Sequence, residues 1–512
     1  MYNFLVKKPK RSWQKMSHEV KFDTGFGSLV PILCEEILPH DTIKLSSELF
    51  TRFSALISPA FQRCDARIEY FFVPNRLLWD DWEKFISGQE ERQQSQNLVK
   101  PYVELDAIKQ DMVENSLFDY LGFPVSFKDS SGVIHEPTNV VGEQKVDVMP
   151  LRAYYKIWYD WYRDENIDTS MEPKTTGGAV NTLSEAIWYL QSRAYPRDYF
   201  TSALPFAQGG QPVRVPLNYP GGRSSMNSSV ASGAMQVGSS SVRVGDTIAS
   251  FKFNQPQNIV QGPTVEELRR TSAIQRWLEK NIRFGSRYVE SIAAHFGIRP
   301  EDYRLDRAEY LGGGKVNVRI SEVLQTSESA TTPLGEDGGH AIASGAASMR
   351  DYTAKEHGFL IGLLSFVPKA SYGQGWPRKF NRWSPTDYAF PEFDNLGEQP
   401  LYKQELYAYG TNTEKVFGYK PRFDEYKHSY DRYCGQFRDS LSFWHLGRIF
   451  MAEPTLSAPF IYINNSGQYP QTDPDRLTRM FATDDTRNII CDMYHHLYIK
   501  RALSKGEVSV LR

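Results

Sequence analysis

The sequence predicts a mainly β protein built as a single β-fold. Short stretches near the N-terminus alternate apolar and polar residues, as at residues 66–70, which is the period of a half-buried strand. Sequence patterns typical of strands occur again in the C-terminal part, at residues 315–320 and 359–367. Helix-like and loop-like segments lie between these regions. We therefore expect one fold that is closed by pairing of N- and C-terminal segments, with the middle of the chain inserted between strands.

Composition agrees with this fold class. The chain has 512 residues, 40% hydrophobic and 13% aromatic, which is enough for a large core. Its 36 glycines and 29 prolines indicate a loop-rich protein and not a helical bundle. The 59 basic and 61 acidic residues give a net charge of -2, so any contact with nucleic acid has to come from a local patch.

Several elements can be placed individually. The run Ile68 to Val73 reads as a strand that Pro74 ends, followed by a short amphipathic segment with two tryptophans. Residues 359–367 are continuously apolar, which predicts a strand buried on both faces. Aromatic residues crowd a predicted helix at 151–166, where a core or interface role is expected. We expect six structural anchors: Phe72, Pro74, Trp79, Trp82, Trp158 and Trp161.

Two further helices are predicted after residue 260. Thr264 and Glu267 have the spacing of a capping box, and apolar residues then follow one helical stripe to Ile282. A second helix is expected from Arg287 to Phe296, ended by Gly297.

The first 20 residues form a basic arm, and residues 21–512 form the main domain. Such an arm is either a solvated tail or an electrostatic tether for nucleic acid, with an aromatic ring available for unpaired bases. The candidate nucleic-acid-binding residues are Lys7, Lys8, Lys10, Arg11, Trp13 and Lys15.

Two polar segments interrupt the main domain. Residues 87–146 read as a long surface excursion. Residues 212–260 are an insertion rich in Gly and Ser, with too little apolar surface for a core of its own.

No catalytic or metal-binding constellation rises above background. The run Leu311 to Lys315 lacks the spacing of a phosphate-binding loop and reads as a glycine hinge before a strand. His495 and His496 are adjacent, so on regular structure they face different directions. We expect no enzyme activity and no cofactor or metal.

The cysteines and the N-terminus bear on where the chain folds. Four cysteines without a Cys-x-x-Cys pair predict buried, reduced thiols. The first 16 residues lack the apolar core of a signal peptide, which favours folding in a cytosol.

Ordered motifs across most of the chain resemble one family, the major capsid proteins of gokushovirus-type phages within the microviruses. The motifs are Asp41-Thr42, Phe71 to Trp79, Met149 to Tyr154, Trp161 to Asn166, Arg197 to Phe200, Pro205 to Gly209, His357-Gly358, Tyr372 to Gly375, Asp387-Tyr388 and Leu396 to Gln399.

This resemblance implies a single eight-stranded antiparallel jelly roll of the viral capsid type with long insertions. Copies of the chain would form pentamer and trimer contacts in a T=1 icosahedral shell around circular single-stranded DNA. Assembly would take place in the cytoplasm of a bacterial host. Partners would include minor capsid, scaffolding and DNA-condensing phage proteins, with no membrane insertion.

The resemblance also implies that the 212–260 insertion forms a threefold protrusion that meets an unidentified host receptor. The residues assigned to it are Gly221, Gly222, Arg223, Ser224, Ser225, Asn227, Gly238 and Ser239.

Two other classes remain open at this point. A carbohydrate-binding or carbohydrate-active jelly roll shares the architecture and would need aromatics and paired carboxylates on a concave face. A dedicated single-stranded DNA-binding protein would need a basic groove along the chain, against which the charge balance argues.

Overall fold

The computed structural model describes residues 10–87, 98–140, 142–180, 186–207, 234–237, 240–243, 264–285, 287–324, 337–394, 396–463, 477–483 and 487–503. The chain divides into two compact units. Unit 1 comprises residues 1–207 and 297–512, and unit 2 comprises residues 208–296. The expected 212–260 insertion falls within unit 2.

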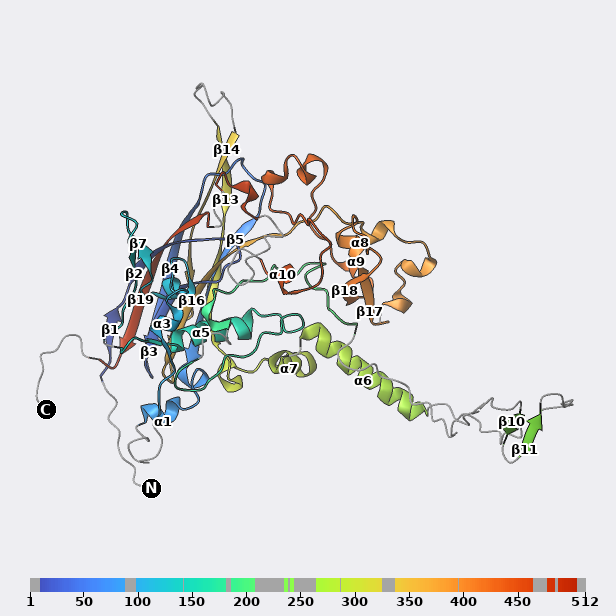
Figure 1. The fold of residues 1–512 in the computed structure, drawn as a ribbon, viewed down its shortest axis with the longest axis horizontal. Helices are drawn as coiled ribbons and strands as arrows, with labels where there is room; N and C mark the ends of the chain where they lie inside the picture. Colours follow the sequence, from blue (N-terminus) through green and yellow to red (C-terminus); the bar gives the residue numbers. More distant parts are fainter. Residues whose placement is uncertain are drawn as a thin grey trace, which may run out of the picture. The chain divides into compact units, whose positions relative to one another are not determined.

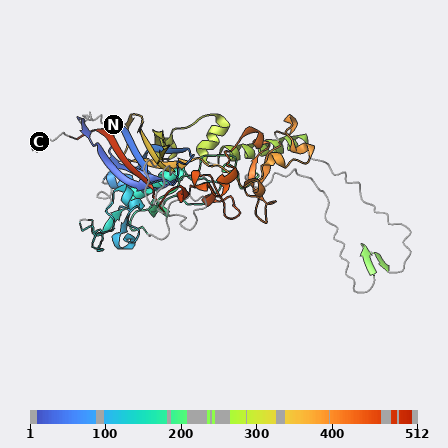
Figure 2. The same cartoon turned by 90° about the horizontal axis from the view of Figure 1, so that it is seen from above.

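A seven-stranded antiparallel sheet forms one layer of unit 1 (Figure 1). The strand order is β1-β19-β4-β14-β13, while β2 also pairs with β19 and β15 with β4. N- and C-terminal segments therefore meet in this sheet, as predicted, and Figure 2 shows red β19 beside blue N-terminal strands. The strands are β1 (Ser12–Lys15), β2 (His18–Thr24), β4 (Thr42–Phe53), β13 (Arg319–Leu324), β14 (Asp337–Ser348), β15 (Tyr352–Thr353) and β19 (Ile489–Arg501).

A four-stranded antiparallel sheet forms the second layer, with the order β12-β5-β16-β3. The chain alternates between the layers as it runs from β2 to β5. The strands are β3 (Val30–Ile37), β5 (Cys64–Pro74), β12 (Glu309–Asn317) and β16 (Gly358–Pro368). The strands expected at residues 66–70 and 359–367 are confirmed as parts of β5 and β16.

The main core lies between the two sheets. It contains inward side chains of β4 and β19, such as Leu49 and Met493, together with Ile68 of β5 and Leu364 of β16. Every second residue of β19 is buried, which is the pattern of a strand covered on one face only.

A second core covers the outer face of the four-stranded sheet. The helix α5 (Met149–Trp161) packs there, with Tyr154 and Trp158 buried against residues such as Phe71 and Ile361. Nearly all of β16 is therefore buried, because both of its faces are covered. The prediction of a strand buried on both faces is confirmed.

The prediction that residues 87–146 form a surface excursion is wrong for part of this stretch, because several of its described apolar residues pack into the second core. Val103, Ile108 and Phe118 are fully buried in it, whereas Phe127 and Ile134 are exposed. The helix α1 (Trp82–Ile86) precedes this stretch. The short elements within it are β6 (Tyr102–Glu104), α3 (Leu105–Ile108), α4 (Leu117–Leu121), β7 (Phe127–Lys128), β8 (Ile134–His135) and β9 (Lys145–Asp147).

The described residues between β16 and β19 form mostly irregular structure. A small antiparallel sheet pairs β17 with β18, and short helices surround it. These elements are β17 (Glu398–Tyr402), α8 (Lys403–Leu406), β18 (Val416–Pro421), α9 (Asp424–Lys427) and α10 (Ala458–Ile461).

The glycine run at 312–314 lies inside β12 and is not a hinge before a strand. Gly312 has a φ of 117°, at a bulge between Tyr310 and Gly312 in the pairing with β5. A Cβ at Gly313 would lie 2.2 Å from the carbonyl oxygen of Ile68. Close approach of two backbones therefore explains these glycines.

Unit 2 contains the two predicted helices. In α6 (Val265–Phe284), Thr264 and Glu267 form the expected capping box. α7 (Tyr288–Phe296) packs on α6, where His295 Nε2 lies 2.7 Å from Asn281 Oδ1 and stacks on Trp277. β10 (Ala234–Val237) pairs with β11 (Ser240–Arg243).

The expectation of buried thiols is wrong for one cysteine. Cys64 and Cys491 are buried and Cys34 is partly buried, but Cys434 is exposed, because it lies in irregular structure after β18. All four are free thiols. Within the described ranges, no helix is both long enough and apolar enough to span a membrane.

Candidate functional site

The described part of the basic arm is paired into the seven-stranded sheet. β1 pairs with β19, so that Trp13 lies opposite Lys500. The Arg11 guanidinium donates a hydrogen bond to the carbonyl oxygen of His40 at 2.6 Å. Immediately after β1, the Met16 amide donates to the Leu497 carbonyl oxygen at 2.9 Å. Residues 11–16 are therefore held in the sheet.

The sequence-predicted nucleic-acid residues separate into three groups. Lys7 and Lys8 lie outside the described residues. Arg11 is used to fix the strand, and Lys10 is exposed next to it. Trp13 and Lys15 point to the same, solvent-facing side of β1.

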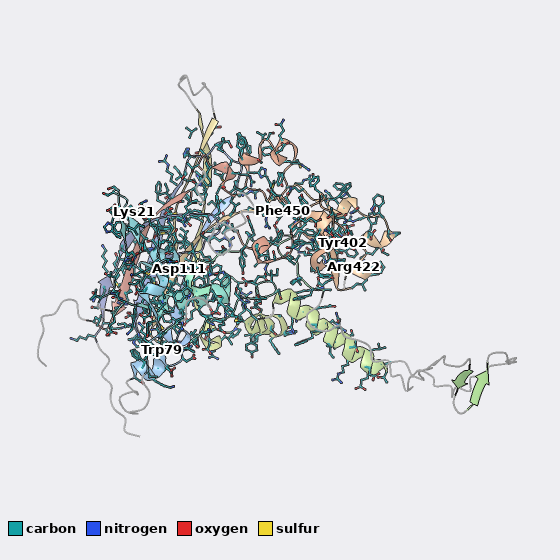
Figure 3. The ribbon with its side chains drawn as sticks, in the orientation of Figure 1. Lys21, Trp79, Asp111, Tyr402, Arg422 and Phe450 are labelled. Atoms are coloured by element: carbon teal, nitrogen blue, oxygen red, sulfur yellow. The ribbon has the colours of Figure 1, made fainter. Side chains whose placement is uncertain are left out.

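The six expected anchors differ in burial. Phe72 lies in the core between the sheets, and Trp79 and Trp158 lie in the second core, all with at most 1% of their surface exposed. Pro74 is also buried. Trp82 and Trp161 are only partly buried and pack on the edge of the second core. Figure 3 labels Trp79.

Hydrogen bonds fix the aromatic helix in place. The indole nitrogen of Trp158 donates to the Ser192 carbonyl oxygen at 3.2 Å, and that of Trp161 to the Ala308 carbonyl oxygen at 2.9 Å. These bonds join α5 to two other segments of unit 1, one before residue 208 and one after residue 296 in the sequence. The helix therefore serves as an internal anchor of the subunit.

A partly buried hydrogen-bonded cluster at Glu69 of β5 joins this strand to Tyr162, at the end of α5, and to Arg193. Glu69 accepts hydrogen bonds from Tyr162 Oη and from Arg193 Nη1, each at 2.6 Å. Burial acts to raise the pKa of Glu69, but the Arg193 guanidinium and these hydrogen bonds outweigh it and lower the pKa. Glu69 thus stays ionised and connects Tyr162 and Arg193 to the four-stranded sheet.

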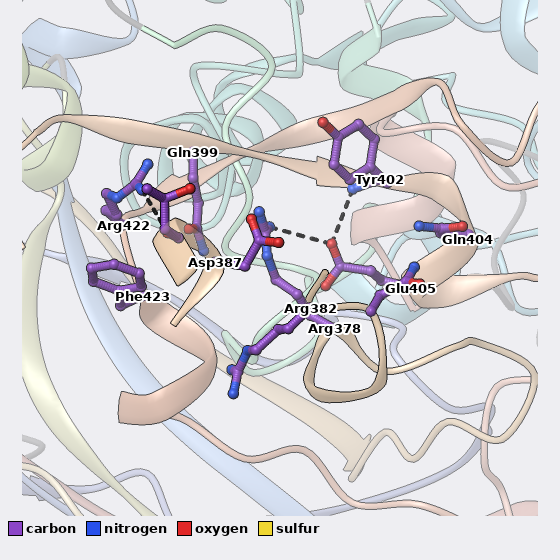
Figure 4. A pocket seen from close by; sticks show the side chains of 11 residues that line it. Arg378, Arg382, Asp387, Gln399, Tyr402, Gln404, Glu405, Arg422 and Phe423 are labelled. Carbon is purple, nitrogen blue, oxygen red and sulfur yellow. Dashed lines mark hydrogen bonds and ion pairs between the residues drawn. The ribbon is translucent and has the colours of Figure 1, made fainter. Parts of the chain in front are cut away.

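An arginine-rich cavity of about 180 Å³ lies beside β17 and β18 (Figure 4). Arg378 lies 3.5 Å from Glu405, and Arg382 lies 3.4 Å from Glu425. Asp387 also lines the cavity. Carboxylates already face these guanidinium groups, so the residues that line the cavity form a structural network of ion pairs and not a binding site for an anion.

Two adjoining cavities of about 480 and 460 Å³ lie at the end of the four-stranded sheet and share Gln62, Arg63 and Lys369. Their lysines also meet carboxylates, since Lys369 pairs with Asp431 at 2.9 Å.

The described residues hold no group of three or more His, Cys, Asp or Glu side chains that could bind a metal ion. His495 is buried and His496 faces solvent beside Glu48, so the two side chains point apart as expected. The eight residues assigned to host attachment all lie outside the described residues.

Two packed antiparallel sheets, one of them covered on its outer face by further chain segments, define the class of a two-layered β protein. The chain belongs to the phage capsid protein (F protein) family, whose sequence profile matches residues 4–511. Its function is that of a microvirus major capsid protein of the gokushovirus type, and its location is the virion. This family is structural, so the chain is not an enzyme.

Three relatives illustrate the similarity. The capsid protein VP1 of Chlamydia phage 1 is 32% identical over 98% of this chain and 96% of its own length. VP1 of Bdellovibrio phage phiMH2K is 31% identical over 87% of this chain and 88% of its own length. VP1 of Spiroplasma virus 4 is 25% identical, with 94% and 92% covered. As a capsid protein, the chain forms a shell from copies of itself.

Proposed function

We propose that the chain assembles into a T=1 icosahedral shell around a circular single-stranded DNA genome. The observation that carries this proposal is the family match over residues 4–511, together with the interleaved order of the strands in the two sheets. The carbohydrate-binding alternative is not retained, because the family is a family of coat proteins.

Each subunit, in this proposal, is an eight-stranded jelly roll. Its strands in chain order are β2, β3, β4, β5, β12, β14, β16 and β19. The order β2-β19-β4-β14 in one sheet and β3-β16-β5-β12 in the other supports this, because two Greek keys folded together produce such an arrangement. β1, β13 and β15 are then additions at the sheet margins.

Exposed aromatic side chains on unit 1 support extensive self-association. Trp383 is 88% exposed, and further large side chains are exposed in the same segment: Trp376, Phe380, Tyr388 and Phe390. Apolar surface of this kind marks interaction sites on soluble proteins. Pentamer and trimer contacts between copies of the chain would cover it.

The basic arm, in this proposal, faces the genome. Its lysines would neutralise phosphates while the near-neutral remainder of the chain avoids indiscriminate binding. Scaffolding, minor capsid and DNA-condensing phage proteins would act as further partners during assembly.

The 212–260 insertion, we propose, gathers at the threefold axes and meets the host. It falls within unit 2, which is compact on its own account, and its sequence is rich in Gly and Ser. Three copies around an axis can bury surface that one copy cannot. Deletion of residues 221–250 should leave subunits folded and abolish attachment or threefold contacts, whereas global unfolding would contradict this assignment.

Electron microscopy of the chain co-expressed with the other phage genes tests the proposal. We expect uniform icosahedral particles with projections at the threefold axes. Monomers or small oligomers alone, with all partner proteins present, would refute it.

A further inference from the structure

Among the described residues, the outer face of the seven-stranded sheet is open, in contrast to the covered outer face of the four-stranded sheet. Alternate residues of β19 point outward there, among them His496, Tyr498 and Lys500. Tyr498 is 39% exposed, as is Trp13 on the adjoining strand β1. Among the described residues of unit 1, no helix packs over this end of the sheet in the way that α5 covers the other layer.

Strand register brings cations and aromatic rings together on this face. Tyr498 lies opposite Lys15 of β1 on one side and opposite Lys44 of β4 on the other. In the next row Trp13 lies opposite Lys500. The ammonium groups of Lys44 and Lys500 lie 5.7 and 5.9 Å from the centre of the Trp13 ring. We call these five residues the β1–β19 platform.

The platform carries an excess of positive charge. Lys44 Nζ forms an exposed ion pair with Asp351 at 3.4 Å. Glu48, farther along β4, lies 3.0 Å from His496. Among the described residues, the three lysines of the platform therefore face one neighbouring carboxylate, that of Asp351, on a chain whose net charge is -2. Such a local excess is what a polyanion requires.

We infer that the β1–β19 platform is a binding site for single-stranded DNA, with bases stacked on Trp13 and Tyr498 and phosphates held by Lys15, Lys44 and Lys500. Unpaired bases can stack on exposed rings, whereas the base faces of a duplex are already stacked. The inference rests on the proposed function, since the packaged genome is the ligand.

A contact with another protein fits the platform less well. The centres of protein interfaces are depleted in lysine, and a buried lysine there loses hydration without a matching partner. A phosphate backbone instead gains from each lysine, because each contact releases a counterion. The combination of three lysines and two rings therefore favours nucleic acid.

The test measures binding of a fluorescent oligothymidylate to the purified full-length coat protein across a salt series. Removing one phosphate contact lowers the dependence of log K on log salt by about 0.7, which is roughly a fivefold loss of affinity at about 0.1 M salt. We expect this from Lys500→Gln and from Lys44→Gln. Tyr498→Ser should weaken binding about tenfold and leave the salt dependence unchanged, since it removes stacking.

Lys355→Gln is the matched control. Lys355 also lies over an aromatic ring, 4.5 Å from the centre of Tyr303, but on other elements of unit 1. This variant should bind like the unaltered protein. Equal behaviour of Lys500→Gln, Lys44→Gln and the control would overturn the inference, and so would equal affinity of the unaltered protein for a duplex of the same length.

Assembly of the same variants separates this inference from the proposed function. If the platform variants keep their affinity for the oligonucleotide but no longer form particles, the platform is a contact between copies and the inference is wrong. If the unaltered chain forms no particles with its partner proteins, the proposed function itself fails. Particles that form and package DNA equally well in all variants refute only the platform.

Discussion

Trp79 and Trp82 lie three residues apart, yet the structure predicts very different costs for removing them. Trp79 has 1% of its surface exposed and sits in the second core. A Cβ at Gly177 would lie 2.7 Å from its indole nitrogen, so the backbone there closes the pocket. Trp82 is only partly buried, with its ring centre 6.4 Å from that of Trp79.

The magnitude follows from burial. A buried tryptophan removes up to about 250 Å² from water, worth roughly 6 kcal/mol at about 25 cal/mol per Å² as an upper bound. Measured losses for such truncations are about 3–5 kcal/mol. We expect Trp79→Ala to lose about 3–5 kcal/mol of unfolding free energy, and Trp82→Ala about 1–2 kcal/mol, because less of its surface is buried.

Urea unfolding of disassembled subunits, followed by far-ultraviolet circular dichroism, measures both values. Trp79→Phe is the conservative control. Its loss should be the smaller one, because the Trp79 indole N–H is buried without a hydrogen-bond partner among the described residues. Equal losses for Trp79→Ala and Trp82→Ala would refute the assignment of Trp79 as the anchor.

Three further predictions concern pH, packing and the arm. Burial, with a smaller effect of His18, lowers the pKa of His495 from 6.5 to about 4, so the unfolded chain takes up this proton first as the pH falls. The free energy of unfolding should therefore fall by roughly 3 kcal/mol as the pH is lowered from about 6.5 to about 4. His495→Gln should reduce the slope of the urea midpoint against pH in this range. An unchanged slope in this variant would contradict the assignment of the effect to His495. Gly313→Ala should lower the free energy of unfolding by about 1–3 kcal/mol, because its Cβ would collide with the β5 backbone. Gly338→Ala is the control and should lower it less, because its Cβ would make only an ordinary contact at 3.5 Å. Equal urea midpoints for the two variants would show that β12 and β5 can move apart to accept the Cβ. Deletion of residues 1–9 should leave β1 in place, whereas deletion of residues 1–16 removes it. The shorter deletion should therefore cause the smaller loss of DNA from particles at high salt, measured by the absorbance ratio of purified particles. Equal DNA retention after the two deletions would show that β1 does not contact the genome.

Local sequence patterns correctly predicted those helices and strands whose formation depends mainly on residues close in sequence. The capping box before α6, the aromatic helix α5 and the apolar run of β16 were all readable, because each depends on neighbouring residues. β14 was not predicted, because its Gly, Ala and Ser residues have low strand propensity. A Cβ at Gly345 would lie 2.7 Å from Val316 of β12, so close approach of the two strands selects small residues there.

Only part of the β1–β19 platform could be predicted from the sequence, for a similar reason. Trp13 and Lys15 stand in an obviously basic N-terminal segment. Tyr498 and Lys500 carry no such signal, since only the pairing of β1 with β19 brings them beside the arm. Periodicity gives alternation along one strand, but register between strands that are hundreds of residues apart depends on the complete fold.

The central position of β19 has a consequence for the synthesis of the protein. β2 and β4 leave the ribosome early, but the strand between them begins only at Ile489. At about 5–20 residues per second, translation of the intervening chain takes roughly 20–90 s, during which the edges of β2 and β4 are unpaired and need protection from aggregation. A polypeptide released before residue 489 lacks the strand that joins them. Prematurely terminated chains would thus be excluded from the shell without a dedicated quality-control factor.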